Sequence, residues 1–403
     1  MGIEKSEMTF MKEYIKKWYA IFLLVLIVVS FFASIIANDK PIYCKLDNQI
    51  FFPAINDWFY GNTKNSIFAN ESWKSKSLQN VIWSPIPFKY FQQNMDEALE
   101  KPFFKPSYSQ NHWLGTDHLG RDIAAGLVNG TKTAILVGFG SIFLIIIIGF
   151  SLGTLSGYYG NNRLIVNKFS FVINSILILF GLIYLISYHH RLHEDQYIYI
   201  FLAVLLFSTI IINITSKKWT FQQLTIPIDS IILKIIELIQ TIPKLLLLIT
   251  MMAILERSIW TIILIIGIFG WTTIAKLTRA ETLRITTLEY ITIVQLYKLT
   301  DMKIIFKHIL PNIFPPLLIS LCFGVATAIM AEAGLSFLGL GLPANEVSWG
   351  SMLSESRLYL NSWWLLVFPG GLLFLTIYSL HKTGEFIRKK YLPTNLDNIN
   401  NYY

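Results

Sequence analysis

Residues 135–150 read ILVGFGSIFLIIIIGF, a stretch without a charged side chain. Residues 21–37, IFLLVLIVVSFFASIIA, have the same character. A helix needs about 20 mostly apolar residues to cross a hydrocarbon core about 30 Å thick. The alternative, buried core helices of a large soluble protein, would require charged faces between the runs, and these stretches show none. Both stretches therefore predict transmembrane helices.

The composition of the whole chain supports this prediction. Of 403 residues, 54% are hydrophobic and only 14% are charged, whereas about a quarter of the residues in a soluble domain carry charge. Long apolar runs lie at 19–37, 133–155, 169–187, 197–214, 231–254, 258–275, 313–333 and 363–380. The sequence therefore predicts an all-α polytopic membrane protein with about eight transmembrane helices.

Lysine and arginine residues collect in segments that would share one side of the membrane. They lie in the N-terminal tail, at 217–218, in the loop 276–311 and at 382–390. Short loops rich in these residues stay in the cytoplasm, so we expect both termini to be cytoplasmic. This bias accounts for the net charge of +8 without a nucleic-acid partner. A cleaved signal peptide is the alternative for the first run, but its length and the lack of an A-x-A-like site favour a retained anchor.

These spans divide the chain into segments. We expect a cytoplasmic tail (1–18), a first transmembrane helix (19–37), an external region (38–130), a second transmembrane helix (131–160), an inserted segment with two extra helices (161–228), a core (229–392) and a C-terminal tail (393–403). The external region is rich in Trp, Pro, Asn and Lys, with turn signals such as SPIP at 84–87. We expect it to be irregular, with little regular core.

Signatures of covalent catalysis are missing from the sequence. GLVNGTKT (126–133) imitates a phosphate-binding loop, but its glycines are too close and Thr131 separates Gly130 from Lys132. There is no H-E-x-x-H, no G-x-S-x-G and no pair of aspartates within the spans. Cys44 lies in the external region and Cys322 in a span, so a disulfide between them is not expected. We predict a protein that performs no covalent chemistry and binds no cofactor.

A histidine cluster, SYHHRLHEDQ (187–196), joins the two inserted runs. His189 and His193 stand at i, i+4 spacing and would share a metal ion if the loop were helical. The alternative is a short polar turn between two helices, and no further ligand is set by the spacing. We therefore expect no metal site and keep these two histidines only as weak candidates.

Ionisable residues within apolar runs are candidates for a transport pathway, because burying a charge in lipid costs several kcal/mol. Glu237 lies inside the run 231–254, with Lys234 three residues earlier and Pro243 further on. A transport role and a snorkelling pair near the membrane surface both fit Glu237. Glu332 opens AEAGLSFLGLGLP (331–343), in which Gly334 and its neighbours permit tight turns. A pathway mouth and simple loop geometry both fit that stretch.

Residues 289–312, EYITIVQLYKLTDMKIIFKHILPN, set polar groups at helical intervals between two spans. Tyr290, Ile293 or Val294, and Tyr297 form an apolar stripe, and the other face carries Glu289, Thr292, Gln295 and Lys298. This pattern predicts a short amphipathic helix, which we expect to end at ILP (309–311), because proline breaks helices. The helix fits either a lipid surface or a groove in a soluble partner.

Several stretches resemble the second permease subunit of the dipeptide, oligopeptide and nickel importers, which are ABC transporters. They are LGTDHLGRD (114–122), GYYG (157–160), DSIILKIIELIQTIPKLLLLI (229–249), IIFKHILPN (304–312), AEAGLSFLGLGLP (331–343), SWGSML (348–353) and WWLLVFPGGLLFLTIYSL (363–380). They occur in the family's order over most of 113–392. The segment at 289–301 resembles the family's Glu-Ala-Ala loop, whose short coupling helix docks into a groove of the ATPase subunit.

The sequence departs from the family at two places. The Glu, Ala, Ala and Gly of the loop correspond here to Thr292, Ile293, Val294 and Lys298. These replacements put the details of docking in doubt. In addition, residues 161–228 separate GYYG from the next motif by far more than the family usually allows. An even number of extra spans leaves the loop on the cytoplasmic side.

The resemblance implies a type I permease core of six helices, the first, the second and the last four, in a bacterial inner membrane. It implies a homologous permease as partner in a heterodimer, two ATPase subunits that bind ATP and Mg, and an external binding protein that delivers peptides or similar small solutes. Coupling to the ATPase would then involve Glu289, Tyr290, Thr292, Ile293, Val294, Tyr297, Lys298, Asp301 and Pro311. The alternative is a membrane scaffold or an uncoupled paralogue without transport activity.

Overall fold

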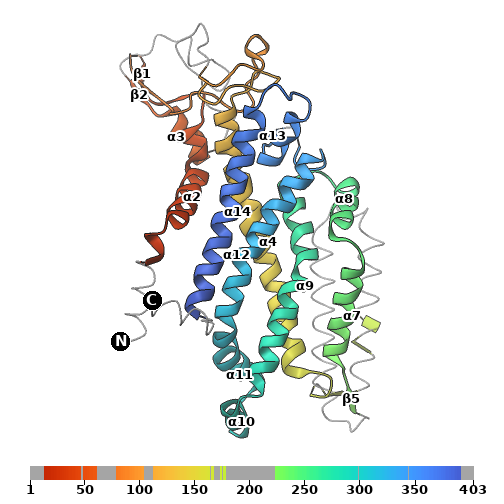
Figure 1. The fold of residues 1–403 in the computed structure, drawn as a ribbon. Helices are drawn as coiled ribbons and strands as arrows, with labels where there is room; N and C mark the ends of the chain where they lie inside the picture. The colour runs from red at the N-terminus through yellow and green to blue at the C-terminus, as the bar shows by residue number, and fades with distance from the viewer. Residues whose placement is uncertain are drawn as a thin grey trace, which may run out of the picture.

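The computed structural model describes residues 13–46, 49–60, 79–103, 112–163, 165–167, 173–174, 176–177, 223–297, 299–343 and 345–391. These residues form a bundle of long helices with a small sheet at one end (Figure 1). We call this the sheet end. The opposite end, which carries the short helix α10 (Glu289–Leu296), is called the α10 end.

Five stretches of the described chain are long and apolar enough to cross a membrane. They are α2 (Trp18–Ile36), α4 (Ile123–Tyr159), α9 (Ile259–Thr286), the stretch Asp301–Phe337, and α14 (Trp364–Tyr391). Each contains one of the predicted runs or nearly coincides with it, which supports a mostly helical polytopic membrane protein. The predicted spans 169–187 and 197–214 lie outside the described residues except for 173–174 and 176–177, and so do His189 and His193.

The predicted span 231–254 is two helices rather than one. α7 (Ile228–Thr241) ends before Pro243, and α8 (Lys244–Ile254) begins directly after it. Proline lacks the backbone N–H that a continuous helix needs, and its ring pushes the preceding residue toward extended geometry. Ile242 accordingly has φ −91° and ψ 128°. The sequence prediction of one continuous helix over 231–254 is therefore wrong.

The bundle is centred on the packing of α4 against α9. Gly149, Gly153 and Gly157 follow one another at every fourth position of α4, so they share one face of the helix. A Cβ atom on Gly153 would lie 2.5 Å from the carbonyl oxygen of Ala275 in α9, and one on Gly149 would lie 2.7 Å from the carbonyl oxygen of Trp271. The absence of side chains on this face lets the two backbones approach closely.

Polar contacts hold α7 against the same two helices near the α10 end. The Arg279 guanidinium of α9 donates to both carboxylate oxygens of Asp229, at 2.5 and 2.7 Å, and Ser156 of α4 donates to the same carboxylate at 2.5 Å. Bidentate pairing of this kind fixes orientation as well as distance. Ile232 and Ile236 then pack on Trp271 and Ala275 of α9.

The two ends of the inserted segment lie side by side. β4 (Ile165–Asn167) and β5 (Gln223–Thr225) form an antiparallel pair in which Ile165 faces Thr225. The backbone N–H of Asp229 also donates to the carbonyl oxygen of Gly160 at 3.2 Å. Because the two ends of the insertion meet, α7 follows α4 in space as it would without the extra residues.

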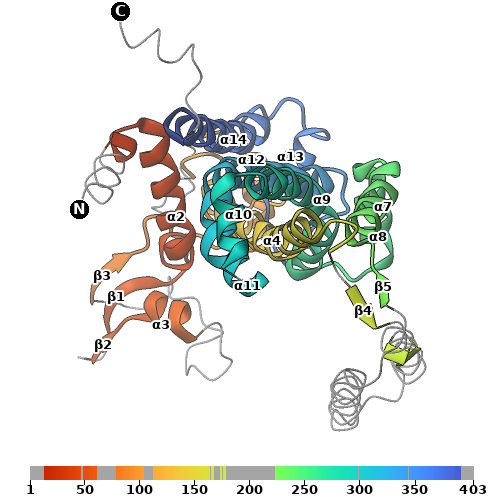
Figure 2. The same ribbon diagram turned by 90° about the horizontal axis from the view of Figure 1, so that it is seen from below.

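The sheet end is more regular than the sequence predicted. β1 (Pro41–Leu46) lies between β2 (Gln49–Phe51) and β3 (Gln79–Trp83) in an antiparallel sheet, beside α3 (Pro53–Tyr60). Figure 2 shows these elements to one side of the bundle, next to α2. A 3-10 turn, η2 (Met95–Glu97), and α13 (Trp349–Ser356) complete this end. Strands of three to six residues are too short to produce a readable alternation, so the sequence did not predict this small sheet within an otherwise irregular region.

The helix over residues 301–337 also differs from the prediction. α11 (Asp301–Ile304), the π-helical turn η4 (Ile305–Ile309) and α12 (Leu310–Phe337) follow one another without a break, so Pro311 does not end a helix. The N–H of Leu310 bonds to the carbonyl oxygen of Ile305, five residues back, which widens the turn before the proline. Asn312 donates its side-chain amide to the His308 carbonyl oxygen at 2.7 Å.

Gly153→Ala tests the contact between α4 and α9. The added methyl group would overlap the Ala275 carbonyl oxygen, and we expect the variant to lose about 1–3 kcal/mol of stability, as overpacked cores do. Thermal unfolding of the protein purified in detergent measures the loss. Gly371→Ala in α14 is the control, because a Cβ atom there meets no atom within 4 Å. Equal unfolding temperatures for the two variants would contradict the close packing.

Candidate functional site

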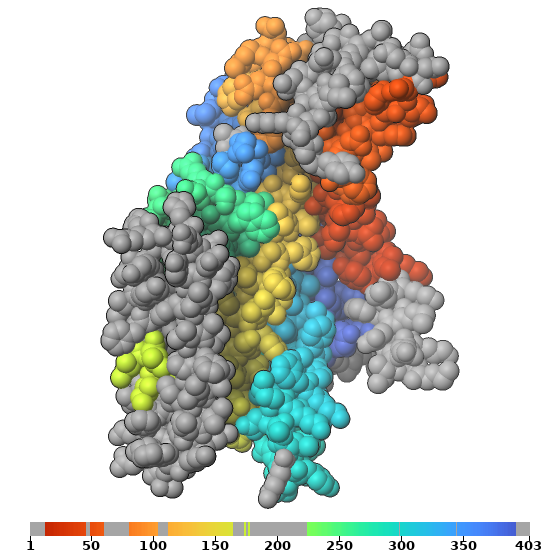
Figure 3. All heavy atoms as spheres, turned by 180° about the vertical axis from the view of Figure 1, so that it is seen from behind, coloured from red at the N-terminus to blue at the C-terminus, as the bar shows by residue number. Residues whose placement is uncertain are grey.

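The first candidate site is α10 and the turns beside it. Figure 2 shows α10 and α11 lying across the ends of α4, α9 and α12, and Figure 3 shows this part of the chain projecting beyond the end of the bundle. Glu289 opens α10, where a carboxylate is favourable beside the positive end of the helix dipole. The helix therefore begins at the residue that the sequence indicated.

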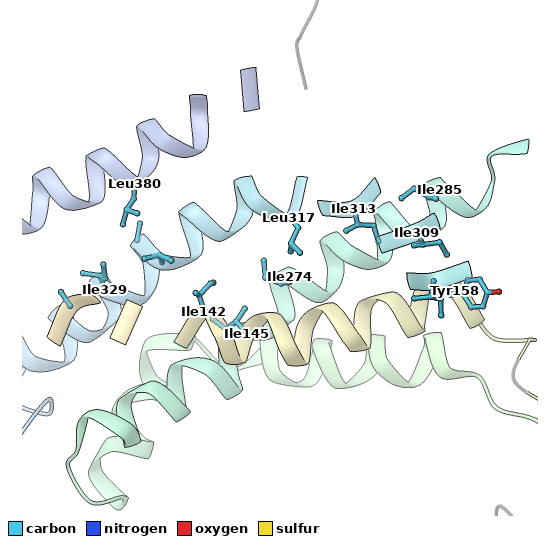
Figure 4. Packing of buried hydrophobic residues seen from close by; sticks show 14 of the residues in the cluster. Ile142, Ile145, Tyr158, Ile274, Ile285, Ile309, Ile313, Leu317, Ile329 and Leu380 are labelled. Carbon is cyan, nitrogen blue, oxygen red and sulfur yellow. The ribbon is translucent and has the colours of Figure 1, made fainter. Parts of the chain in front are cut away.

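One face of α10 is anchored in the bundle. Ile291 is fully buried among Ile285, Ile304 and Ile309, and Val294 packs against the same cluster. Figure 4 shows Ile285, Ile309 and Ile313 with Tyr158 at this end of the core. A fully buried isoleucine contributes about 1.5–3 kcal/mol relative to an exposed one. The core thus holds α10 at a defined place and orientation.

The opposite face of α10 is apolar and exposed. Ile293 is 54% exposed, Leu296 and Tyr297 are both 76% exposed, and Tyr290 is 39% exposed. We call these four residues the α10 surface. Three of them belong to the stripe that the sequence predicted, but Val294 faces the bundle. α10 therefore has two apolar faces, one buried and one exposed. Of the polar residues that the sequence placed on its other face, Thr292 is exposed, Gln295 is half-buried and Lys298 lies outside the described residues.

Further exposed apolar residues lie on the next turns. Met302 of α11 and Phe306 of η4 are each 60% exposed, and they stand four residues apart. Sequence reasoning missed both, although their spacing resembles that of the α10 stripe. Exposed apolar side chains that gather in one region of a surface mark interaction sites.

Asp301 and Tyr290 connect α10 and α11 to the long helices. The Tyr158 hydroxyl at the end of α4 donates to the Asp301 carboxylate at 2.8 Å. The Asn312 side chain of α12 donates to the Tyr290 hydroxyl at 3.1 Å. Both predicted residues therefore form hydrogen bonds within this chain. Asp301 links α11 to α4, and Tyr290 links α10 to α12.

The second candidate site lies where α7 and α8 meet. Glu237 is exposed on α7, and no ion pair with Lys234 forms. A helical ion pair is weaker when the lysine precedes the glutamate, which agrees with the absence of an ion pair between these two residues. Beyond Pro243, Lys244 opens α8 and lines a cavity of about 270 Å³ between α4, α9 and α12. Sequence reasoning missed Lys244, although a lysine inside an apolar run was a readable signal.

Glu332 is buried inside α12 near the sheet end, rather than opening a loop. Glu332 is only 1% exposed, and its carboxylate accepts a hydrogen bond from the Ser336 hydroxyl at 2.6 Å. The Ser348 hydroxyl at the start of α13 also contacts this carboxylate. Gly334, one turn from the end of α12, meets no atom within 4 Å of an added Cβ. Glu332 thus joins α12 to α13, and the structure does not bring it together with Glu237.

Two motifs far apart in the sequence meet at the sheet end. Arg121 of LGTDHLGRD donates to Asp117 and to Glu355 of α13, each at 2.5 Å. Asp117, His118 and Glu355 offer ligand atoms within 4.8 Å of one another, which is compatible with a metal ion. However, the Arg121 guanidinium already engages both carboxylates. Burial raises the pKa of Glu355. This group therefore acts as an ion-pair network between the two segments.

His112 stabilises the start of α4. Its Nδ1 lies 2.7 Å from Asp122, and its Nε2 lies 3.1 Å from Glu97. Asp122 in turn accepts from the Ala125 N–H at 2.7 Å and caps α4. Burial alone would lower the pKa of His112, but the hydrogen bonds and negative charges of Asp122 and Glu97 outweigh it and raise this pKa above its ordinary value. The charged form of His112 is therefore favoured in the folded protein.

Comparison with known proteins connects these sites to a family. Residues 224–382 match the family model described as binding-protein-dependent transport system inner membrane component. The oligopeptide transport system permease protein OppC of Bacillus subtilis is 27% identical over 311 residues, 76% of this chain and 79% of that protein. The inner membrane ABC transporter permease protein YejE of Escherichia coli is 26% identical over 93% of this chain and 92% of its own length.

A solved structure of the MetNI methionine ABC transporter in an inward-facing conformation aligns with 65% of this chain and 95% of its own chain. The TM-score is 0.42 and the identity 15%.

Two isoleucines on opposite faces of α10 give a matched test of its anchoring. Ile291→Ala removes a fully buried side chain and is expected to cost about 2–5 kcal/mol. Ile293→Ala, on the exposed face, should leave the thermal unfolding temperature close to that of the wild type. If the two variants unfolded at the same temperature, α10 would not be anchored through Ile291.

The raised pKa of His112 predicts a pH-dependent contribution to stability. A group whose pKa is higher in the folded state stabilises fully below its unfolded pKa of about 6.5, and this contribution is lost as the pH rises through the folded pKa. We expect the unfolding temperature of the wild type to exceed that of His112→Gln by more at pH 6 than at pH 9. An equal difference at both pH values would show that His112 does not titrate in this way.

Proposed function

Residues 224–382 place this chain in the family of inner membrane components of binding-protein-dependent transport systems, and from that premise we propose that the α10 surface docks on an ATPase subunit of an ATP-driven importer. The chain is a multi-pass membrane permease whose homologues are permease subunits of peptide ABC importers. The single observation that carries the docking proposal is the exposure of four apolar side chains on a helix whose other face is fixed in the core.

The geometry of α10 supports insertion into a groove. An amphipathic helix that binds in this way presents anchors at i, i+3 and i+7, and Tyr290, Ile293 and Tyr297 have this spacing. Burying apolar surface contributes about 25 cal/mol per Å². The family's two alanines correspond to positions 293 and 294. Because Val294 faces the bundle, of these two residues it is the bulkier Ile293 that would change the contact with the groove.

We further propose that ATP and Mg bind on two partner ATPase subunits and that this chain hydrolyses nothing. Both termini and the α10 end would face the cytoplasm, and the sheet end would face outward, where a binding protein delivers its cargo. Peptides are the proposed cargo, because OppC belongs to an oligopeptide transport system. A homologous permease would form the other half of the pathway.

The fixed contacts of α10 suggest how movement would reach the membrane. Closing of the ATPase subunits would displace α10 together with the adjoining α11. Tyr290 of α10 is bonded to α12, and Asp301 of α11 is bonded to α4. The Asp229–Arg279 pair ties α7 to α9, which leads directly into α10. The helices α4, α7, α9 and α12 would therefore move with the docked α10.

A double variant, Ile293→Glu with Tyr297→Glu, tests the docking. Two charges on the α10 surface cannot be buried in an apolar groove without a large desolvation cost, so we expect co-purification of the ATPase subunits and uptake of peptide to fall to background. Leu360→Glu is the control for co-purification, since it places a charge on an 84% exposed leucine at the sheet end. Retention of the ATPase subunits by the double variant would overturn the docking and favour the scaffold alternative.

A further inference from the structure

Lys244, at the break between α7 and α8, is a charged residue within a long apolar run. Lys244 follows Pro243 directly and is the first residue of α8. α7 has 14 residues and α8 has 11, so the break falls near the middle of the apolar run. A charged side chain at the centre of a membrane costs several kcal/mol in contact with lipid, so such residues face a hydrated cavity or a partner charge.

The cavity beside Lys244 offers such surroundings. It measures about 270 Å³ and is lined by α4, α9 and α12, with Ile142 and Ile145 of α4 on its wall. Lys244, Thr273 and Thr327, which also line it, are exposed at the surface of the chain. Gly270 of α9 and Gly324 of α12 also line it, and the two isoleucines pack against these glycines, since a Cβ atom on either would overlap an isoleucine side chain. Thr273 and Ser320 add hydroxyl groups, whereas the Thr327 hydroxyl donates to the Phe323 carbonyl oxygen at 2.8 Å. The cavity is thus apolar over much of its wall, with one cation and two hydroxyl groups that can donate to a ligand.

The charge of Lys244 is not balanced within the described part of the chain. None of the ion pairs there includes Lys244, and no acidic residue lines the cavity. Hydroxyl groups donate hydrogen bonds to anions, and a lysine ammonium donates up to three. Cation and donors together suit a carboxylate, whose binding would offset the cost of placing the ammonium group within the membrane.

We propose that Lys244 and the cavity beside it bind a carboxylate group of the cargo during its passage. This inference rests on the proposed import of peptides, each of which carries a carboxylate at its C-terminus. Lys244 would then make the permease itself selective for cargo with a free carboxylate. Binding would be transient, because one cation and a few hydroxyls form only a partial shell around the anion. The apolar wall would accept side chains of different sizes.

The test uses the complete importer, with its second permease, ATPase subunits and binding protein, reconstituted in vesicles. The probes are tri-alanine and its C-terminal amide, which differ only in the carboxylate. The uptake ratio of acid to amide is compared between the wild type, Lys244→Met and Lys244→Arg. Because all three share one binding protein, a change in this ratio reports on the permease. Lys132→Met, in α4 but outside the cavity, is the control.

We expect Lys244→Met to lower the ratio of acid to amide uptake about tenfold, as loss of a charged hydrogen bond would. Lys244→Arg should retain most of the wild-type ratio, and Lys132→Met all of it. Uptake of the amide by Lys244→Met should persist, which shows that the variant folds and couples.

Three results would overturn the inference. An unchanged ratio in Lys244→Met, with normal uptake, would leave the import of peptides intact and remove the role of Lys244. Loss of the second permease from purified Lys244→Met would assign the lysine to an acidic group of that partner. Failure of the wild-type importer to take up either peptide would overturn the proposed cargo, and the inference would fall with it.

Discussion

The close approach of α4 and α9 is the constraint on which the other sites depend. Glycines on one face of α4 bring it against backbone carbonyl groups of α9, at a distance that no side chain would permit. α9 then continues directly toward α10, while α4 supplies Tyr158 to the anchor of α11 and Ile142 and Ile145 to the cavity wall. One interface therefore sets the positions of both α10 and the cavity beside Lys244. A wider separation would change both at once.

The inserted segment and the long stretch between α2 and α4 make the chain longer than expected, but they leave the contact between α4 and α9 undisturbed. The inserted segment begins and ends at the paired strands β4 and β5, so it adds residues without altering the path from α4 to α7. The described residues between α2 and α4 likewise lie at the sheet end, where Arg121 and Glu355 join two segments that are more than 230 residues apart. Insertions are tolerated where their two ends are close together, because the surrounding contacts need not move.

The apolar faces of α10 illustrate how burial divides similar residues between different tasks. Ile291 and Ile293 are the same residue two positions apart, yet one is fully buried in the core and the other is 54% exposed. The first determines where α10 lies, and the second determines what it presents. Polar contacts from α10 to α12 and from α11 to α4 restrain this part of the chain. The proposed transmission of force from an ATPase to the membrane helices would require such a restraint.

Hydrophobic runs alone determined the class of this protein, because a membrane span depends on local length and composition, and these are readable in a single segment. The spacing of Tyr290, Ile293 and Tyr297 similarly predicted the position of α10 and its exposed stripe. Two prolines show what the local sequence cannot predict. Pro243 separates α7 from α8, whereas Pro311 lies within a continuous helix, since a widened turn before it accommodates the ring. Tertiary structure alone decided that difference, the inward direction of Val294, the Arg121–Glu355 contact and the cavity beside Lys244. Each depends on residues from distant segments, and local periodicity contains no information about which segments will meet.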